Sequence, residues 1–160
     1  MNEITFHFYR STYPWWNPLN ISAGLIRIVT NSYFNHTSIQ IGGQIWQSKA
    51  FKGVIRTTKQ LEKPDSSISI KVSKEKQEAV QRLIYFLDAQ LGKGYDYACV
   101  LGFLSAKPIQ HRTRLFCSEL VNVAFSYLIP GLYEQSRTLI SPKDLYNRVL
   151  FFKKGMEHAN

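Results

Sequence analysis

Apolar and polar residues alternate over three stretches of the chain, at residues 4–9, 36–41 and 68–72. Because successive side chains of a strand point to opposite faces of a sheet, this period of two predicts strands that each bury one face. Residues 13–18 read Tyr-Pro-Trp-Trp-Asn-Pro, and so much proline is incompatible with a regular element. We therefore expect a sheet of half-buried strands, with a loop after the first of them.

The second alternating stretch forms one half of a predicted hairpin. Two glycines at 42–43 follow it and supply a turn into a strand at residues 45–47. His36 opens the stretch and shares its face with Ser38 and Gln40, whereas Thr37, Ile39 and Ile41 occupy the other face. His36 is therefore expected on the polar face of a strand, where a cleft can use its imidazole.

Beyond residue 72 the apolar spacing changes to the 3.6-residue period of amphipathic helices. Ser73 is placed to cap a first helix and Gly92 to end it. The apolar stripe of this helix is Val80, Leu83, Ile84, Leu87 and Leu91. A second helix is expected to begin near Cys117 and to stop before Pro130. Its apolar stripe is Leu120, Val121, Ala124 and Leu128.

Ser141 begins a third predicted helix, with Pro142 at the first helical position and Asp144 three residues after the cap. The apolar run 149–152 then predicts a last edge strand. No repeat, low-complexity tract or linker divides the sequence, so we expect residues 1–160 to form a single domain. Strands and helices in one unit give the class α+β.

The composition agrees with a folded domain. The chain has 160 residues, 44% hydrophobic and 14% aromatic, so it can bury a substantial core. A formal net charge of +9 adds an attraction to anionic surfaces, which include peptidoglycan, phospholipid headgroups and nucleic acids. The charge by itself does not choose among these partners. The basic residues are scattered rather than ordered into a nucleic-acid-binding motif, so nucleic acid is not the expected partner.

The N-terminus resembles no targeting segment. It has neither a basic start nor a continuous apolar stretch, and no run in the chain approaches the ~18 residues that cross a bilayer. We therefore expect the protein to be cytoplasmic where it is made, with later release or delivery left open.

Two cysteines are too few for a disulfide framework. Neither has a second Cys or His two to five residues away, so a zinc site is not expected, and no other cofactor is indicated. Cys99 lies in the apolar run 98–101 and is interpreted as a small buried hydrophobic residue. Both thiols are expected to be reduced.

Cys117 has the sequence context of a nucleophile, because it opens a predicted helix. The unpaired amides and partial positive charge of a helix N-terminus can lower the pKa of a thiol from about 8.5, and the same amides can face the oxyanion of a tetrahedral intermediate. His36 can supply the base from a distant strand. The pair predicts a cysteine hydrolase or acyltransferase, and an alkylation of Cys117 well below pH 8.5.

Five segments carry motifs in a distinctive order. They are Leu25–Arg27 with His36–Ile39, Ile45–Ser48 with Gly53-Val54, Leu91–Tyr97, Phe116–Val121 and Ile140–Leu145. Together they resemble the circularly permuted branch of the NlpC family of papain-like cysteine hydrolases, the YiiX-like proteins. The resemblance implies a permuted papain-like fold, with an antiparallel sheet and packed helices. Two features depart from the family: a Gly-Asp pair near the N-terminus is absent, and Gln47 stands where an acidic residue is expected.

The resemblance also assigns roles to single residues. Cys117 is the expected nucleophile, His36 its base, and Gln47 the third group, which orients the imidazole. Gln40, Ser48 and a backbone carbonyl are alternatives to Gln47, and His7 and His111 are alternatives to His36. Tyr95 and Ser118 are expected at the oxyanion and substrate site, although Tyr95 is as readily a packed aromatic. The negative charge of Glu119 is expected to interact favourably with the helix dipole rather than to act in catalysis.

Three classes of function follow. The first is an amidase or peptidase that acts through a thioester on cell-wall peptides or related amides. The second is lipid acyl transfer or lipid hydrolysis, because the permuted branch resembles the lecithin:retinol acyltransferases. In this class Trp15 and Trp16 form a candidate membrane or substrate loop, although packing of the two side chains under a loop is the simplest interpretation. The third is a non-enzymatic binder of anionic surfaces or nucleic acid, which the scattered charges make the least favoured.

Overall fold

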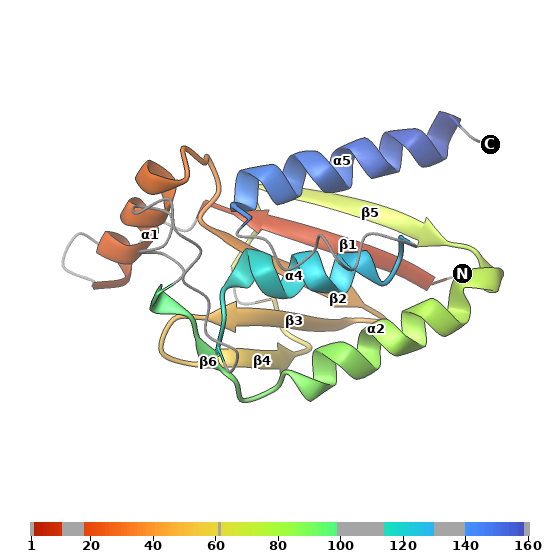
Figure 1. Cartoon of the computed structure of the whole chain (residues 1–160), viewed down its shortest axis with the longest axis horizontal. Coiled ribbons are helices and arrows are strands. Elements are labelled where there is room, and N and C mark those ends of the chain that lie inside the picture. Colours follow the sequence, from red (N-terminus) through yellow and green to blue (C-terminus); the bar gives the residue numbers. More distant parts are fainter. Residues whose placement is uncertain (1, 11–17, 61, 99–113, 130–139, 159–160) are drawn as a thin grey trace.

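Five strands form one antiparallel sheet in the order β4-β3-β2-β1-β5. The strands are β1 (Asn2–Tyr9), β2 (His36–Ile41), β3 (Gln44–Lys49), β4 (Gly53–Thr57) and β5 (Ser66–Val72). The computed structural model describes residues 2–10, 18–60, 62–98, 114–129 and 140–158 (Figure 1). Since β1 and β2 pair from Ile4↔Ile41 to Tyr9↔His36, the N-terminal strand lies beside the one that carries His36.

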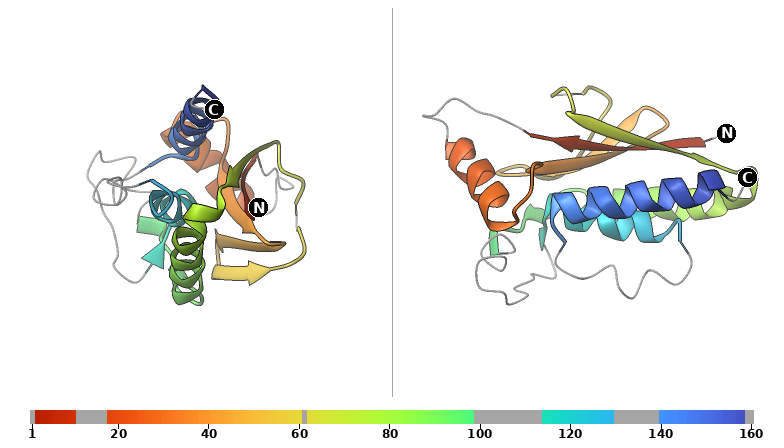
Figure 2. Two further views of the ribbon diagram at one scale, coloured as in Figure 1. Left: turned by 90° about the vertical axis from the view of Figure 1, so that its right-hand side faces the viewer. Right: turned by 90° about the horizontal axis from the view of Figure 1, so that it is seen from above.

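Helices cover one face of this sheet. The main ones are α2 (Gln77–Ala89), α4 (Cys117–Ser126) and α5 (Pro142–His158). Helix α4 packs against β2 and β3 and has α2 and α5 as neighbours, so the structure has a sheet layer and a helix layer (Figures 1 and 2). Helix α1 (Pro18–Val29) lies at one end of the sheet, on the same side as the short parallel pair of β6 (Gly94–Tyr95) and β7 (Arg114–Leu115).

The two faces of the sheet differ in chemistry, as the alternation predicts. Ile4, Phe6 and Phe8 of β1 are fully buried against the helices. On the opposite face polar side chains bond across the strands: Thr5 Oγ1 lies 2.9 Å from Ser69 Oγ, and Tyr9 Oη lies 2.9 Å from Ser38 Oγ. The structure is thus mixed α+β with an antiparallel sheet and packed helices.

Most of the elements expected from the sequence are present. The three alternating stretches are strands, and the glycines of the hairpin turn have positive φ angles of 55° and 80°. Helix α4 begins at Cys117 and buries its expected stripe. At the start of α5, Ser141 Oγ accepts a hydrogen bond from the Asp144 amide at 3.1 Å. These elements depend on local signals, which explains why they were predictable.

Other expectations are wrong. Residues 149–152 continue α5, because Val149 follows Leu145 by one helical turn and both are fully buried. Ser73 makes no side-chain cap and precedes a 3₁₀ turn (Lys74–Lys76) before α2.

Two elements, helix α1 and strand β4, were not expected from the sequence. Four residues with predicted roles lie outside the described residues: Trp15, Trp16, Cys99 and His111.

A close backbone approach attaches β4 to the segment before β6. Gly53 has φ +68°, and a Cβ atom there would lie 2.1 Å from the Lys93 carbonyl oxygen. The same carbonyl accepts a hydrogen bond from the Val54 amide at 2.8 Å. Only glycine fits this position, and the contact holds Tyr95 near the end of the sheet.

Over the described residues, no helix is long and apolar enough to cross a membrane.

Candidate active site

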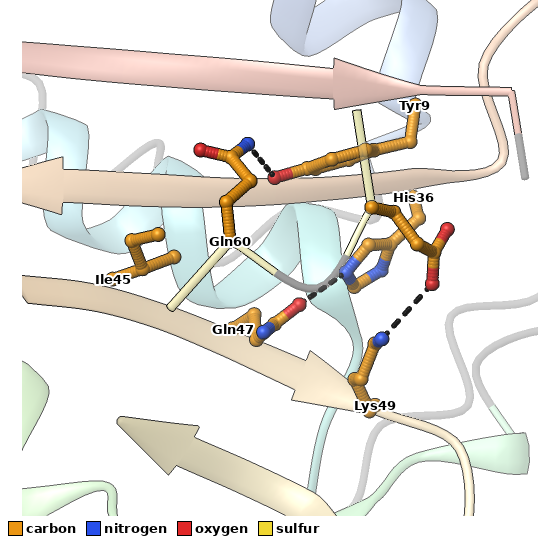
Figure 3. A pocket seen from close by; sticks show the side chains of 7 residues that line it. Tyr9, His36, Ile45, Gln47, Lys49 and Gln60 are labelled. Carbon is orange, nitrogen blue, oxygen red and sulfur yellow. Dashed lines mark hydrogen bonds and ion pairs between the residues drawn. The ribbon is translucent and has the colours of Figure 1, made fainter. Parts of the chain in front are cut away.

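His36 lies at the start of β2, and its ring is held by Gln47 of β3. Its Nε2 is 3.0 Å from Gln47 Oε1, and Gln47 itself is buried (Figure 3). An amide oxygen only accepts hydrogen bonds, so Nε2 donates and the lone pair of the neutral ring is on Nδ1. The ring of Tyr9 lies 5.3 Å from that of His36, centroid to centroid. The expected contact between His36 and Gln47 is present, and it makes Nδ1 the basic nitrogen.

The alternatives to these two residues have other partners. Gln40 Oε1 lies 2.8 Å from Nε2 of His7, whose Nδ1 is 2.8 Å from Ser67 Oγ. Ser48 Oγ donates to the Leu115 carbonyl at 2.6 Å. His7 is therefore occupied on the polar face of the sheet, and neither Gln40 nor Ser48 is the partner of the His36 ring.

Cys117 is the first residue of α4, is fully buried and has a free thiol. Hydrogen bonds from the backbone amides of Thr37, Ser118 and Cys117 itself lower the pKa of the thiol, but burial acts more strongly and raises the pKa to about 12. The expectation of a thiol that ionises well below pH 8.5 is therefore wrong for this conformation. The removal of the thiol from water raises its pKa more than the amides at the helix N-terminus lower it.

The N-terminus of α4 lies where β2 and β3 separate. Their ladder ends at the pair Ile39↔Trp46, although β3 continues to Lys49. Ser48 of β3 binds the Leu115 carbonyl just before the helix, while the Thr37 amide of β2 faces the Cys117 sulfur. The structure thus brings the helix of Cys117 to the strand of His36, through the residue that follows the histidine.

His36 is neutral at physiological pH. Burial lowers its pKa to about 4; the Gln47 hydrogen bond raises it, the Lys49 charge lowers it and the Glu62 charge raises it. Lys49 Nζ and Glu62 Oε1 form an ion pair at 3.0 Å. With the pKa of the Cys117 thiol raised to about 12, both side chains are neutral at physiological pH.

A small cavity lies beside the His36 ring on the polar side of the sheet (Figure 3). It is lined by Tyr9, His36, Ile45, Gln47, Lys49, Gln60 and Glu62. Its volume of about 10 Å³ is enough for roughly one water molecule and far too small for an acyl chain or a peptide. Cys117 is not among the residues that line it.

Helix α1 packs against Cys117. Cys117 packs with Ile26 of α1 and with Tyr95 and Phe116, and Leu25 lies against the same cluster. This cluster is separate from the main core between sheet and helices. Because Cys117 is 0% exposed, a reagent reaches its sulfur only when the packing around it opens.

We expect Ile26→Ala to raise the rate at which iodoacetamide alkylates Cys117 in the native protein. Truncation weakens the packing of α1 over the sulfur, and a loss of about 1.4 kcal/mol in local closure corresponds to about a tenfold faster reaction. Ile28→Ala is the matched control, since Ile28 lies on the same helix and is 80% exposed. Equal alkylation rates in both variants and the parent, read by intact mass, would show that α1 does not limit access.

Tyr95 and Ser118 both lie near the sulfur, in different ways. Tyr95 is buried in the Cys117 cluster, with its ring 5.7 Å from that of Phe116. Ser118 turns its hydroxyl away, since Oγ donates to the Ile140 carbonyl at 2.5 Å, and presents only its amide to Cys117. Glu119 accepts a hydrogen bond from the Phe116 amide at 3.4 Å, which agrees with an electrostatic role at the helix start.

Three features of the site were not found in the sequence. They are the cover by Ile26, the Lys49–Glu62 ion pair near His36, and Thr37 beside the sulfur. The sequence pattern does set Thr37 apart, because it is a hydroxyl residue on the apolar face of its strand. In the part of the chain that the structure describes, no group of three or more His, Cys, Asp or Glu side chains could hold a metal ion.

Comparisons of the chain with models of protein families, with curated proteins and with solved structures each find no match.

Proposed function

We propose that the protein is a cysteine hydrolase that attacks amide or peptide carbonyls, in a circularly permuted papain-like arrangement. The observation that carries the proposal is the environment of Cys117: a sulfur at a helix N-terminus, faced by three backbone amides, beside the strand that begins with His36. Gln47 presents Oε1 to Nε2 of His36, which leaves the lone pair on Nδ1 for the thiol proton.

The chemistry proceeds from a neutral pair. As sulfur attacks the carbonyl carbon, Nδ1 of His36 takes the thiol proton, and the backbone amides at the start of α4 stabilise the oxyanion. The imidazolium then protonates the leaving amine as the carbon–nitrogen bond breaks and a thioester forms. Water, deprotonated by the same nitrogen, hydrolyses the thioester and restores the thiol.

Lipid acyl groups are the second candidate substrate. The favouring observation is the apolar cover: the nucleophile lies under Ile26, while Ile28 on the same helix is exposed in a protein of net charge +9. Apolar side chains near the sulfur suit an acyl chain, and the positive net charge of the protein attracts an anionic lipid headgroup. The catalytic roles of Cys117 and His36 are the same for either substrate.

Intact-mass measurement separates the two candidates and tests both. The protein is incubated with peptidoglycan stem peptides or with phospholipid vesicles, and the mass gained on Cys117 identifies the acyl group that is transferred. We expect an adduct with one substrate class that is absent from Cys117→Ala. If no such substrate leaves an adduct or is hydrolysed in a Cys117-dependent way, the proposal is wrong.

A further inference from the structure

The Thr37 hydroxyl is anomalous for a buried polar group. Thr37 is 0% exposed, and Oγ1 is the one buried side-chain oxygen or nitrogen without a hydrogen-bond partner among the described residues. Burying a hydroxyl without a partner costs free energy, and an unsatisfied group in a folded protein calls for an explanation. A valine would fill the same position of β2 without that cost.

The position of Thr37 relative to the sulfur suggests what the hydroxyl does. Its backbone amide faces Cys117, and its side chain shares the face of β2 with Ile39, which packs in the core under α4. The amide and the hydroxyl of one threonine are joined through only Cα and Cβ. The unpartnered oxygen is therefore close to an amide that faces the sulfur of Cys117.

We propose that the Thr37 hydroxyl is a catalytic hydrogen-bond donor at the oxyanion site, and this inference rests on the proposed function. When sulfur bonds to the carbonyl carbon, the π pair of the carbonyl moves to oxygen, and that oxyanion accepts the hydrogen bond. No proton is transferred from Thr37, because His36 already holds the thiol proton. The group that completes the site is the carbonyl oxygen of an ester or amide substrate, which gives the hydroxyl its missing partner.

The experiment compares two reactions of the same sulfur. Acetylation by p-nitrophenyl acetate passes through a tetrahedral oxyanion, whereas alkylation by iodoacetamide is a direct displacement without one. We expect Thr37→Val to slow acetylation of Cys117 about tenfold to a hundredfold while alkylation stays within about twofold of the parent. Thr37→Ser retains the hydroxyl and is expected to acetylate at close to the parent rate. Intact mass follows both adducts.

The outcomes distinguish this inference from the proposal on which it rests. Acetylation of Thr37→Val at the parent rate, or an equal loss in both reactions, overturns the oxyanion role of Thr37 and leaves Cys117 as the nucleophile. A parent protein that is not acetylated at Cys117 overturns the proposed function, and the inference with it. Urea unfolding gives an independent reading: Thr37→Val is expected to be at least as stable as the parent, and a lower midpoint shows a partner in the folded protein and refutes the inference.

Discussion

Cys117→Ala and His36→Ala are each expected to reduce kcat/KM by about a thousandfold or more, and the double variant is expected to be scarcely worse than either. The reason is that the two side chains act as one unit in the proposed mechanism. A thiol whose pKa is raised to about 12 attacks only while a base takes its proton, and the base has no other role in the first step. The measurement is steady-state hydrolysis of the substrate found by intact mass, or of p-nitrophenyl acetate.

Two variants serve as controls for this result. Replacing Gln47 by Ala is expected to cost less than either catalytic substitution, because orientation is only part of what the base does. His7→Gln is expected to leave activity close to that of the parent, since His7 bonds Ser67 and Gln40 on the polar face of the sheet. If Cys117→Ala retained full biological activity, the enzyme proposal would fail. A steeply salt-dependent affinity for DNA in that variant would then favour the binding function.

The fold was predictable where short-range signals were strong. Alternation located β1 and β2, and helix spacing with Cys117 at its start located α4. The run 149–152 shows the limit, because a short apolar stretch has no period of its own and the helix begun at Ser141 continues through it. Strand β4 was missed although it pairs with its sequence neighbour β3, because its residues do not alternate clearly between buried and exposed positions.

The contact between His36 and Gln47 was predictable from the sequence, and the ionisation of Cys117 was not. The order of motifs paired His36 with Gln47, and that contact is present at 3.0 Å. The ionisation of Cys117 depends on whether water reaches the sulfur, and the residues packed with Cys117 include Ile26 of α1, a helix that was not predicted. Long-range burial therefore reversed the direction of a pKa shift that local sequence had suggested.

Thr37 illustrates the same limit in a single side chain. A hydroxyl on the apolar face of a strand can be read from the alternation, but most such groups find a partner after folding. Only the folded structure reveals that Oγ1 has none within the described residues. The sequence can therefore identify a hydroxyl on an apolar face, whereas the hydrogen bonds of the folded structure show whether that hydroxyl has a partner.

Phe6→Ala is expected to have the largest effect on stability, lowering the free energy of unfolding by about 3–5 kcal/mol. Phe6 lies on β1, pairs with Ile39 of β2 and Ile68 of β5, and is fully buried. Its ring meets that of Phe125 in α4 edge to face, with centroids 5.4 Å apart. The substitution therefore leaves a cavity at the contact between the sheet and the helix of Cys117.

Phe151→Ala is the matched control for this prediction, because it removes the same ring from a side chain that is 81% exposed and is expected to change stability by less than about 0.5 kcal/mol. Urea unfolding of the three proteins, followed by far-ultraviolet circular dichroism, gives the comparison. A loss of about 3–5 kcal/mol is a large share of the 5–15 kcal/mol that holds a typical domain. Equal midpoints for Phe6→Ala and the parent would contradict the packing of β1 against α4, and with it the arrangement that brings Cys117 to the strand of His36.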